Sequence, residues 1–572
     1  MKHPQILPLR RPFGAMTPWL MTLLAGASCG GVHAETTPGQ LLQDIRILQP
    51  QTQELPAPLP GAGLVLGPAE SGPQTQVRFV VKQFKLEGLE GFPVQALNDV
   101  LAAWLNKPIT YDDLKQGTQA LAALCREKGL LVRAVLPPQD ITEGQVTIRI
   151  IESRMGGLAI DNRSLRISNA QIQAWFDKQV PRGQVISLDA LDHALLTLGD
   201  LPTVAVSGYL QEGEAPGQTV LAMTVQDDPR YNGQALADNF GDKNTGQLRS
   251  SAQLNVNGLM GHGDQLNLYG LHTQGSDYVR VGWSTTTAAA TRGQRMGLYA
   301  SRMDYRIISS AFQSARVTGA ADVLGFEATD PLIRSRTTNA VVSFNWAHSR
   351  FKTWNDGVFN ADRAYTSRVA QFGVSGNRLD DWQGGGTSTA SLMASVGDMD
   401  RVASSDTDQV GGFFAKLRYG LSRTHNLAPG LSLFASLTGQ IASHNMDSSE
   451  QLYLGGPLNV RAYASGQGSA SQGQLYTMEL RQQLPGPFQL ALFYDEGRAQ
   501  TWKFKLPTHN VDNAYNLRGA GASLSWSGPL GAQVKATWAQ RIGQPSPSVS
   551  SLLTKNGGLD RSRVWLNASI PF

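Results

Sequence analysis

An arginine and an aspartate are the residues of this chain whose types suggest a specific chemical pairing. Asp495 lies in the segment 488–497, where apolar and polar residues alternate, and it falls on the face opposite Leu490 and Leu492. If the apolar face meets lipid, Asp495 points into an enclosed interior, where an unpaired carboxylate is costly. Arg461, in the preceding glycine- and serine-rich stretch, is the candidate partner, because a guanidinium can bind a carboxylate through two parallel hydrogen bonds.

The residues alone also allow a second interpretation of this pair. Arg461 would then be a solvated loop cation, and Asp495 would be a charge on the wall of an aqueous pore. Which interpretation holds depends on the elements that carry the two residues. The stretch 448–497 has the pattern of a strand, a long loop, a strand, a turn and a strand, so we expect the loop to be held between neighbouring strands.

The sequence contains no other group of residues with the spacing of a catalytic or metal-binding site. The nine histidines show no paired spacing typical of zinc ligands, and no nucleophile elbow or pair of acids is placed for hydrolysis. Gly384, Gly385 and Gly386 lack the lysine and hydroxyl residue that follow in a phosphate-binding loop. We therefore predict that the protein is not an enzyme and that it has no catalytic residues, no cofactor and no bound metal.

The composition is unlike that of an ordinary cytosolic enzyme. Only 16% of the 572 residues are charged, 60 are glycine, and the net charge of +4 is spread without the basic patch of a nucleic-acid binder. A basic start, an apolar core and the small-residue site 32–34 predict a signal peptide over residues 1–34. Cys125 is then the one cysteine of the mature chain, so no internal disulfide can form, and its spacing from Leu114 and Leu121 predicts a core position.

A short amphipathic segment and a proline-rich segment come next. Residues 35–49 place Leu41, Leu42 and Ile45 on one face of a predicted helix. Six prolines in residues 50–76 predict an extended linker. At the level of the sequence, the helix is either an element with a defined seat in the molecule or a frayed terminus, and both interpretations stay open.

Two similar segments follow, at residues 77–152 and 153–228. Each has the pattern of a strand, two helices and two strands, with a period of about 75 residues. A helix in each copy begins with the residues of a capping box, namely Thr110 with Asp113 and Ser168 with Gln171. The pattern predicts two small α+β domains.

The remaining residues, 229–572, alternate with period two almost throughout. Residues 340–346 and 431–437 each place apolar side chains on one face and polar side chains on the other, and the last alternating segment ends on Phe572. No stretch downstream of the signal peptide reaches eighteen apolar residues, so a membrane helix is not expected. A transmembrane barrel fits this pattern, although a soluble sandwich also alternates.

Four motifs resemble those of the two-partner-secretion transporters (TpsB), which export large proteins across the Gram-negative outer membrane. The VRGY/F loop motif corresponds to Val460, Arg461, Ala462 and Tyr463, and the FxDxG strand motif corresponds to residues 493–497. The other two motifs are residues 238–241, at the start of the barrel, and residues 454–457, before the loop arginine. The chain departs from the family pattern where Ala462 replaces a glycine, and where residues 469–472 replace a common Gly-Asp.

This resemblance implies a transmembrane antiparallel β-barrel of about sixteen strands, preceded by two small α+β domains of the POTRA type. The barrel would span 229–572, with a long inward loop at about 450–473, and about 21 residues would be available per strand and connection. The resemblance further implies that Arg461 anchors the loop to Asp495 on the barrel wall, with Tyr463 stacked beside it. It also implies a plug helix over residues 35–49 and a barrel-assembly signal at Phe572.

The functional expectation from the resemblance is export of a partner protein. The partner would be a secreted exoprotein of the TpsA type, which the periplasmic POTRA domains capture unfolded before it passes through the barrel without nucleotide hydrolysis. Outer-membrane lipid and, during biogenesis, the barrel-assembly machinery would be further partners, and nucleic acid would not. The alternatives are an insertase of the same superfamily and a passive porin, of which the porin leaves about 150 periplasmic residues without a role.

Overall fold

The computed structural model describes most of the chain after the predicted signal peptide. The described residues are 36–48, 78–88, 94–141, 143–215, 217–261, 263–286, 293–310, 316–355, 363–401, 406, 408–507, 509, 512–554 and 559–572. The predicted signal peptide (1–34) and the predicted linker (50–76) lie outside the described residues. Within the part that the structure describes, no helix is both long and apolar enough to cross a membrane.

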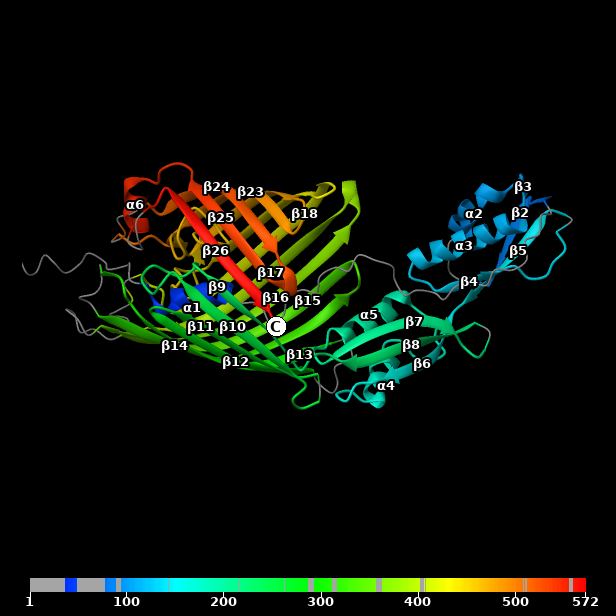
Figure 1. Cartoon of the computed structure of the whole chain (residues 1–572), viewed down its shortest axis with the longest axis horizontal. Helices are drawn as coiled ribbons and strands as arrows, with labels where there is room; N and C mark the ends of the chain where they lie inside the picture. Colours follow the sequence, from blue (N-terminus) through cyan, green and yellow to red (C-terminus); the bar gives the residue numbers. More distant parts are fainter. Residues whose placement is uncertain are drawn as a thin grey trace, which may run out of the picture. The chain divides into compact units, whose positions relative to one another are not determined.

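Sixteen antiparallel strands close into a barrel (Figure 1). Each strand pairs with its neighbour along the chain, and β26 returns to pair with β9. The strands are β9 (Tyr231–Asp238), β10 (Arg249–Asn257), β11 (Gln265–Thr273), β12 (Ser276–Thr286), β13 (Arg295–Arg306), β14 (Val317–Arg334), β15 (Thr338–Asn355), β16 (Arg363–Asp380), β17 (Gly386–Asp400), β18 (Gly412–Ala428), β19 (Leu431–Ala442), β22 (Gln472–Gln483), β23 (Phe488–Gln500), β24 (Ala514–Ser527), β25 (Gln533–Arg541) and β26 (Ser562–Pro571). The predicted barrel is confirmed.

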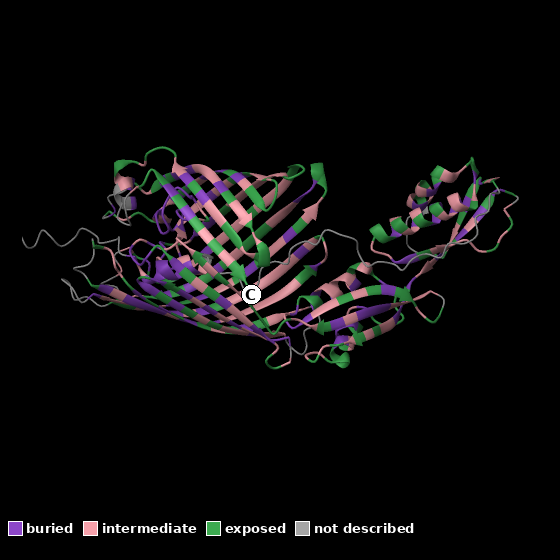
Figure 2. Cartoon of the chain, in the orientation of Figure 1, coloured by how far each residue is buried: buried purple, intermediate pink, exposed green. Residues whose placement is uncertain are grey.

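Residues along the barrel strands alternate between more exposed and more buried positions (Figure 2). On β23, Leu492 and Tyr494 are 54% and 37% exposed, whereas Phe493 and Asp495 are 5% and 0% exposed. The apolar outer face suits contact with lipid. Closure of the barrel leaves no strand edge with unpaired backbone groups in the bilayer. Asp495 consequently points into the barrel interior.

The first small domain packs two helices on a three-stranded sheet. Its elements are β1 (Phe79–Val80), β2 (Gln83–Glu87), α2 (Val94–Leu101), β3 (Pro108–Ile109), α3 (Tyr111–Glu127), β4 (Val132–Val135) and β5 (Gln145–Glu152), with a short 3₁₀ turn at Ala102–Trp104. β5 lies between β2, which runs parallel to it, and β4, which runs antiparallel. Cys125 is fully buried in the core of this domain, among Leu121, Val146 and Ile148, as its helical spacing predicts.

The second small domain repeats this topology. Its elements are β6 (Arg154–Asn162), α4 (Asn169–Asp177), α5 (Leu188–Gly199), β7 (Val204–Glu212) and β8 (Gln218–Asp227). β8 lies between the parallel strand β6 and the antiparallel strand β7. Both predicted capping boxes form, because the hydroxyls of Thr110 and Ser168 accept from the amides of Asp113 and Gln171, whose side chains accept from the cap amides in return.

Candidate functional site

A buried loop between β19 and β22 carries Arg461. It spans residues 443–471 and thus begins earlier than the predicted loop at 450–473. Within it, β20 (Leu452–Tyr453) pairs with β21 (Ser469–Ala470). The amide of Gly455 donates to the carbonyl of Gln467 at 2.8 Å. A Cβ at Gly455 would lie 2.5 Å from the carbonyl oxygen of Ala464, so only glycine allows this close backbone approach. The loop is therefore a specific turn that fixes where Arg461 points.

Arg461 binds two carboxylates on the barrel wall. Its Nε and Nη2 donate to Oδ2 and Oδ1 of Asp495 at 2.8 and 2.7 Å, and its own amide donates to Oδ2 of Asp495 at 3.1 Å. Nη1 donates to Oε1 of Glu479 at 2.6 Å. All three side chains are buried, so the charges are shielded from water and each depends on the others for compensation. The sequence analysis proposes Arg461 as the partner of Asp495, and the structure brings the two residues together.

Two aromatic residues complete the seat of Arg461. The guanidinium carbon lies 3.4 Å from the centroid of the Phe493 ring, and Nε1 of Trp565 donates to the carbonyl of Arg461 at 2.7 Å. The ring that stacks on the guanidinium is Phe493, and the expected stacking of Tyr463 beside the arginine stays a prediction. Phe493 can take this place because it is two residues from Asp495, on the same inward face of β23. Tyr463 is buried in the same cluster of apolar side chains as Phe493.

Ala462, which stands where the family motif has glycine, packs directly on a glycine of the wall. A Cβ at Gly519 on β24 would lie 2.6 Å from the Cβ of Ala462. This distance is below van der Waals contact, so the wall provides the space that the extra methyl of Ala462 occupies. Val460, the remaining member of the predicted motif, is fully buried in the same cluster as Tyr463.

Glu479 and Trp565 are members of this site that the sequence did not predict. Glu479 lies on the inward face of β22, where it pairs in register with Phe493. Alternation within the strand could have predicted that its side chain points inward. Trp565 lies on β26, and nothing in the local sequence connects it with Arg461, which is 104 positions away. A helix, α6 (Pro547–Thr554), was also missed, and its Val549 and Leu553 pack against the loop cluster.

The motif at residues 238–241 links the barrel closure to the loop. The side chain of Asn239 donates to the carbonyl of Val564 at 3.0 Å and accepts from the amide of Leu566 at 2.9 Å, which ties β9 to β26. The carbonyl of Phe240 accepts from the hydroxyl of Ser465 at 2.6 Å. The loop therefore contacts the strand pair at which the barrel closes.

Phe572 lies at the other end of the same strand pair. Its amide and carbonyl exchange hydrogen bonds with Gly233 on β9, both at 2.9 Å. Its ring covers Gly233 and stays largely exposed, consistent with an outward position on the barrel. The last residue of the chain thus takes part in barrel closure.

The N-terminal helix α1 (Pro38–Leu48) lies inside the barrel (Figure 1). Leu41, Leu42 and Ile45 are buried against inward-facing side chains of β11 to β15. The hydroxyl of Thr37 donates to Ser448 at 2.7 Å, and Nε2 of Gln43 donates to the carbonyl of Gln451 at 2.6 Å, so the helix also contacts the loop. The apolar face that the sequence predicts for this helix is buried, and the barrel wall beneath it is apolar too.

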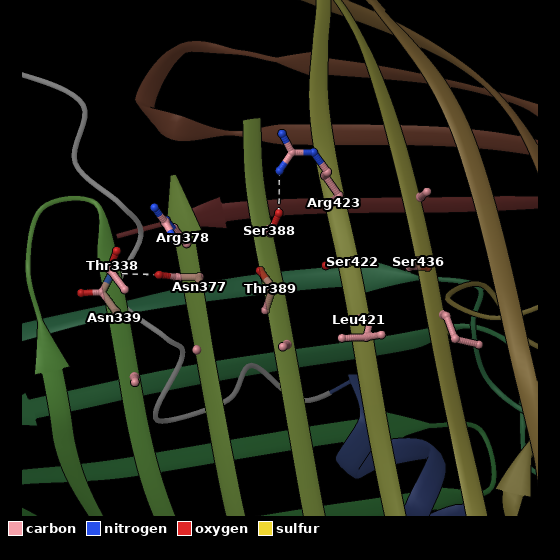
Figure 3. Close-up of a pocket in the computed structure, with 15 residues that line it drawn as sticks. Thr338, Asn339, Asn377, Arg378, Ser388, Thr389, Leu421, Ser422, Arg423 and Ser436 are labelled. Atoms are coloured by element: carbon pink, nitrogen blue, oxygen red, sulfur yellow. Dashed lines mark hydrogen bonds between the residues drawn. The ribbon is translucent and has the colours of Figure 1, made fainter. Parts of the chain in front are cut away.

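Elsewhere the described structure offers no catalytic constellation. A groove of about 650 Å³ lies on β15–β19, and Arg461 is not among the residues that line it (Figure 3). Some of its polar side chains pair with one another, as Arg423 donates to the hydroxyl of Ser388 at 2.7 Å and Asn339 donates to Asn377 at 2.9 Å. Among the described residues, no group of three or more His, Cys, Asp or Glu side chains could hold a metal ion.

The barrel, the buried loop and the small domains are those of a known protein family. Residues 217–533, more than half of the chain, match the family model described as haemolysin secretion/activation protein ShlB/FhaC/HecB. The chain belongs to this family. Residues 79–153 match the ShlB-type POTRA domain, which covers the first small domain.

Individual members of the family and related solved structures agree with this assignment. The heme/hemopexin transporter protein HuxB of Haemophilus influenzae is 26% identical over 444 residues, covering 75% of this chain and 78% of that protein. The outer membrane transporter CdiB of Dickeya dadantii is 22% identical over 455 residues, covering 76% and 77%. The solved structure of CdiB from Escherichia coli has a TM-score of 0.63 at 19% identity, covering 90% of this chain and 94% of that one.

As a member of this family, the chain is a two-partner-secretion transporter of the outer membrane, and its POTRA domains lie in the periplasm. BamA from Haemophilus ducreyi, lacking POTRA domains 1–3, shares the fold with a TM-score of 0.52 at 13% identity. That likeness concerns the fold alone. The family match favours the transporter over the insertase alternative.

Proposed function

We propose that this transporter exports a secreted exoprotein of the TpsA type through its barrel, and that the Arg461 seat holds the loop in the position that export requires. The observation that carries the proposal is the buried contact of Arg461 with both Asp495 and Glu479. A loop rich in glycine and serine has high conformational entropy, so an anchor of this kind is needed to give it one position in the barrel.

We further propose that the POTRA domains, residues 77–152 and 153–228, capture the unfolded partner in the periplasm. Supporting this, β2 and β4 are the outer strands of the first sheet, and β6 and β7 are the outer strands of the second. An outer strand has backbone groups that can pair with an extended client strand. The barrel-assembly machinery would act during biogenesis, through the C-terminal strand that ends on Phe572, and lipid would contact the outer face of the barrel.

Export in this proposal uses neither catalysis nor nucleotide hydrolysis by the transporter. Folding of the partner outside the cell supplies the free energy, because a folded partner cannot return through the barrel. At rest, α1 closes the lumen, a role that is supported by its buried position against the wall and the loop.

The test of the proposed function is secretion of the partner by cells that carry the transporter. Deleting residues 77–152 should stop secretion, because the client can no longer be captured, while the barrel still inserts. Insertion is measured as faster migration of unheated protein on a detergent gel, and secretion as partner in the culture medium at matched barrel levels. Continued export by the truncated form would contradict the capture role.

A further inference from the structure

The groove on β15–β19 lies on the outer face of the barrel. On β18, Lys416 points inward, because it pairs with Glu450 of the loop inside the barrel. Leu421 lies an odd number of residues further along the same strand and is 55% exposed. Successive side chains of a strand point to opposite faces, so Leu421 points outward. The groove that Leu421 lines is therefore on the side that contacts lipid.

The groove is at the periplasmic end of its strands. β9 begins at Tyr231, directly after β8 of the second POTRA domain, so the first barrel strand starts at the periplasmic side. Neighbouring barrel strands are antiparallel, and β15 and β17 therefore start at that side as well. Thr338, the first residue of β15, lines the groove, and Arg378 lines it near the end of β16. The groove thus meets the periplasmic leaflet of the membrane.

Small residues form the floor of the groove. Strand register pairs Ala340 with Gly376 and Gly376 with Ala390, and Leu421 follows on β18. We call Ala340, Gly376 and Ala390 the small-residue row. Val374, the next outward residue of β16 toward the middle of the membrane, is 52% exposed, so a larger side chain borders the row there. The result is a depression of about 650 Å³ in the lipid-facing surface.

Polar side chains follow on the periplasmic side of the small-residue row. Strand register pairs Arg378 with Ser388 and Ser388 with Arg423, and the three lie on neighbouring strands (Figure 3). Nη1 and Nη2 of Arg423 donate to Oδ2 and Oδ1 of Asp380 at 2.8 and 2.9 Å, which compensates the charge of Arg423. Arg378 is exposed, and it forms no hydrogen bond or ion pair with another residue that the structure describes. The donors of Arg378 therefore remain available to a ligand.

These polar side chains lie at the depth of the lipid headgroups. Trp382 follows in the turn after β16, where it is 62% exposed, and its ring centroid is 5.4 Å from the guanidinium carbon of Arg423. Tryptophan is enriched at the interface between membrane and water. Arg378 and Arg423 therefore lie near the level of the lipid phosphates, whereas the small-residue row, one pair deeper, lies at the level where the acyl chains begin.

We propose that the groove binds one phospholipid of the periplasmic leaflet, with its phosphate on Arg378 and Ser388 and an acyl chain over the small-residue row. A guanidinium binds a phosphate through two parallel charge-assisted hydrogen bonds. The hydroxyl of Ser388 accepts from Arg423 at 2.7 Å and keeps its own proton, which it can donate to a phosphate oxygen. An acyl chain fills the depression, whose lining otherwise lacks dispersion contacts.

A phospholipid fits this groove better than two other occupants. A soluble phosphate ester would bind Arg378 but would leave the apolar floor uncovered. A second copy of the chain would place its own lipid-facing surface against Arg378, and an apolar surface supplies no anion for a guanidinium. The inference goes beyond export of a partner protein and does not depend on it.

The test is mass spectrometry of the intact transporter, purified in detergent and titrated with dioleoylphosphatidylethanolamine. The measured quantity is the lipid concentration at which half of the transporter carries one lipid. Dioleoylglycerol, which lacks the phosphate, and glycerophosphoethanolamine, which lacks the acyl chains, are the control ligands. We expect each control to need a concentration higher by at least about tenfold, because each can satisfy only one of the two rows.

Substitutions then locate the site. Arg378→Ala should raise the half-saturating concentration about tenfold, because the phosphate loses its charged donor. Ala390→Leu should raise it about fivefold, because the new side chain fills the depression. Arg368→Ala is the matched control: it removes an exposed arginine of the same face of β16, toward the extracellular end, and should leave binding unchanged.

Each variant is first checked for the fast migration of a folded barrel, and Arg378→Gln or Ala340→Leu replaces one that does not fold. Unchanged binding in both groove variants would overturn the inference, as would equal binding of dioleoylglycerol. Equal binding of glycerophosphoethanolamine would assign Arg378 to a soluble anion instead. Dimers of the transporter that disappear in Ala390→Leu would assign the groove to a second copy of the chain.

Discussion

At the scale of single residues, the site depends on charge compensation in a buried place. Arg461 forms hydrogen bonds to both Asp495 and Glu479, and Arg481 also donates to Glu479 at 2.7 Å. Two carboxylates and two guanidiniums therefore alternate in one series of contacts between the loop and the barrel wall. Removing one member leaves its partners buried without compensation, which is more costly than the pair itself is stabilising.

We expect Arg461→Ala and Asp495→Ala each to insert normally but to export poorly. The arginine substitution should cost the loop anchor about 3–5 kcal/mol, because it leaves the buried carboxylate of Asp495 without a cation and Glu479 with Arg481 alone. The double variant should be little worse than Arg461→Ala, since the residues act as one unit. The measurement is a double-mutant cycle on secreted partner at matched barrel levels. Fully additive losses would show that the two residues act separately.

Arg461→Lys provides the matched control for this cycle. Lysine keeps the positive charge but lacks the planar fork that reaches both oxygens of Asp495 and also Glu479. We expect it to restore little of the export that Arg461→Ala loses. Export at the level of the unaltered chain would mean that charge alone is sufficient.

A second prediction at this scale concerns the contact between Gly519 and Ala462. Gly519→Ala should displace the loop tip, because the new methyl would lie 2.6 Å from the Cβ of Ala462, and overpacking of this kind costs about 1–3 kcal/mol. Ala462→Gly should restore export in the Gly519→Ala background. The readout is secreted partner, together with the temperature at which the barrel loses its fast migration. Failure of Ala462→Gly to rescue would place the effect of Gly519→Ala elsewhere.

At the scale of elements, α1 combines an apolar face that favours its position in the barrel with a partly buried acid, Asp44, that opposes it. Burial raises the pKa of Asp44 to about 8, with a further increase from nearby Asp242 and an opposing effect of Arg249. Burial also raises the pKa of Asp242 to about 6. Tyr453 of the loop interacts with Asp44 as well. The seated helix thus holds Asp44 in its protonated form, whereas a released helix would ionise it.

This difference predicts that the closed state weakens as pH rises. Between about pH 6 and 8, Asp44 binds one proton when α1 enters the barrel and the channel closes. The ratio of open to closed channels should therefore rise by up to about tenfold per pH unit. Asp44→Asn should remove this dependence and keep the channel closed, while Asp381→Asn, in an exposed turn, should not change it. The measurement is open probability in planar bilayers from pH 6 to 8. An unchanged pH dependence in Asp44→Asn would contradict this assignment.

At the scale of the whole molecule, the barrel closes through its shortest strand pair. β26 and β9 pair over five residues, from Asn567 with Asp238 to Pro571 with Gln234, and the mutual hydrogen bonds of Phe572 and Gly233 extend the pairing by one position. The side chain of Asn239 adds two further bonds to β26. Closure therefore depends on a few identifiable groups at the two ends of one seam.

We expect deletion of Phe572 to lower the yield of folded barrel several-fold, because the chain loses two seam hydrogen bonds and the aromatic ring that covers Gly233. Phe572→Tyr keeps both features and should assemble normally. The measurement is the fraction of protein in outer-membrane extracts that migrates fast without heating. Equal fractions for the deletion and the unaltered chain would show that the last residue has no part in closure.

The sequence by itself determined the barrel and the direction in which Asp495 points. Period-two alternation is a local property of each strand, so the inward face of β23 was predictable without any knowledge of its neighbours. The capping boxes at Thr110 and Ser168 were predictable for the same reason, since each involves residues three positions apart. The pairing of Arg461 with Asp495 followed from the family resemblance combined with this alternation.

Only the tertiary structure decided the remaining partners of the site and the nature of the inner wall. Trp565 reaches the carbonyl of Arg461 because barrel closure brings β26 next to the loop, and no local pattern encodes that distance. The apolar surface under α1 is assembled from single residues on β11 to β15, and it becomes continuous only when strand register aligns Met303 with its neighbours. Strand register depends on contacts between distant segments, so the seat of α1 was visible only in the folded molecule.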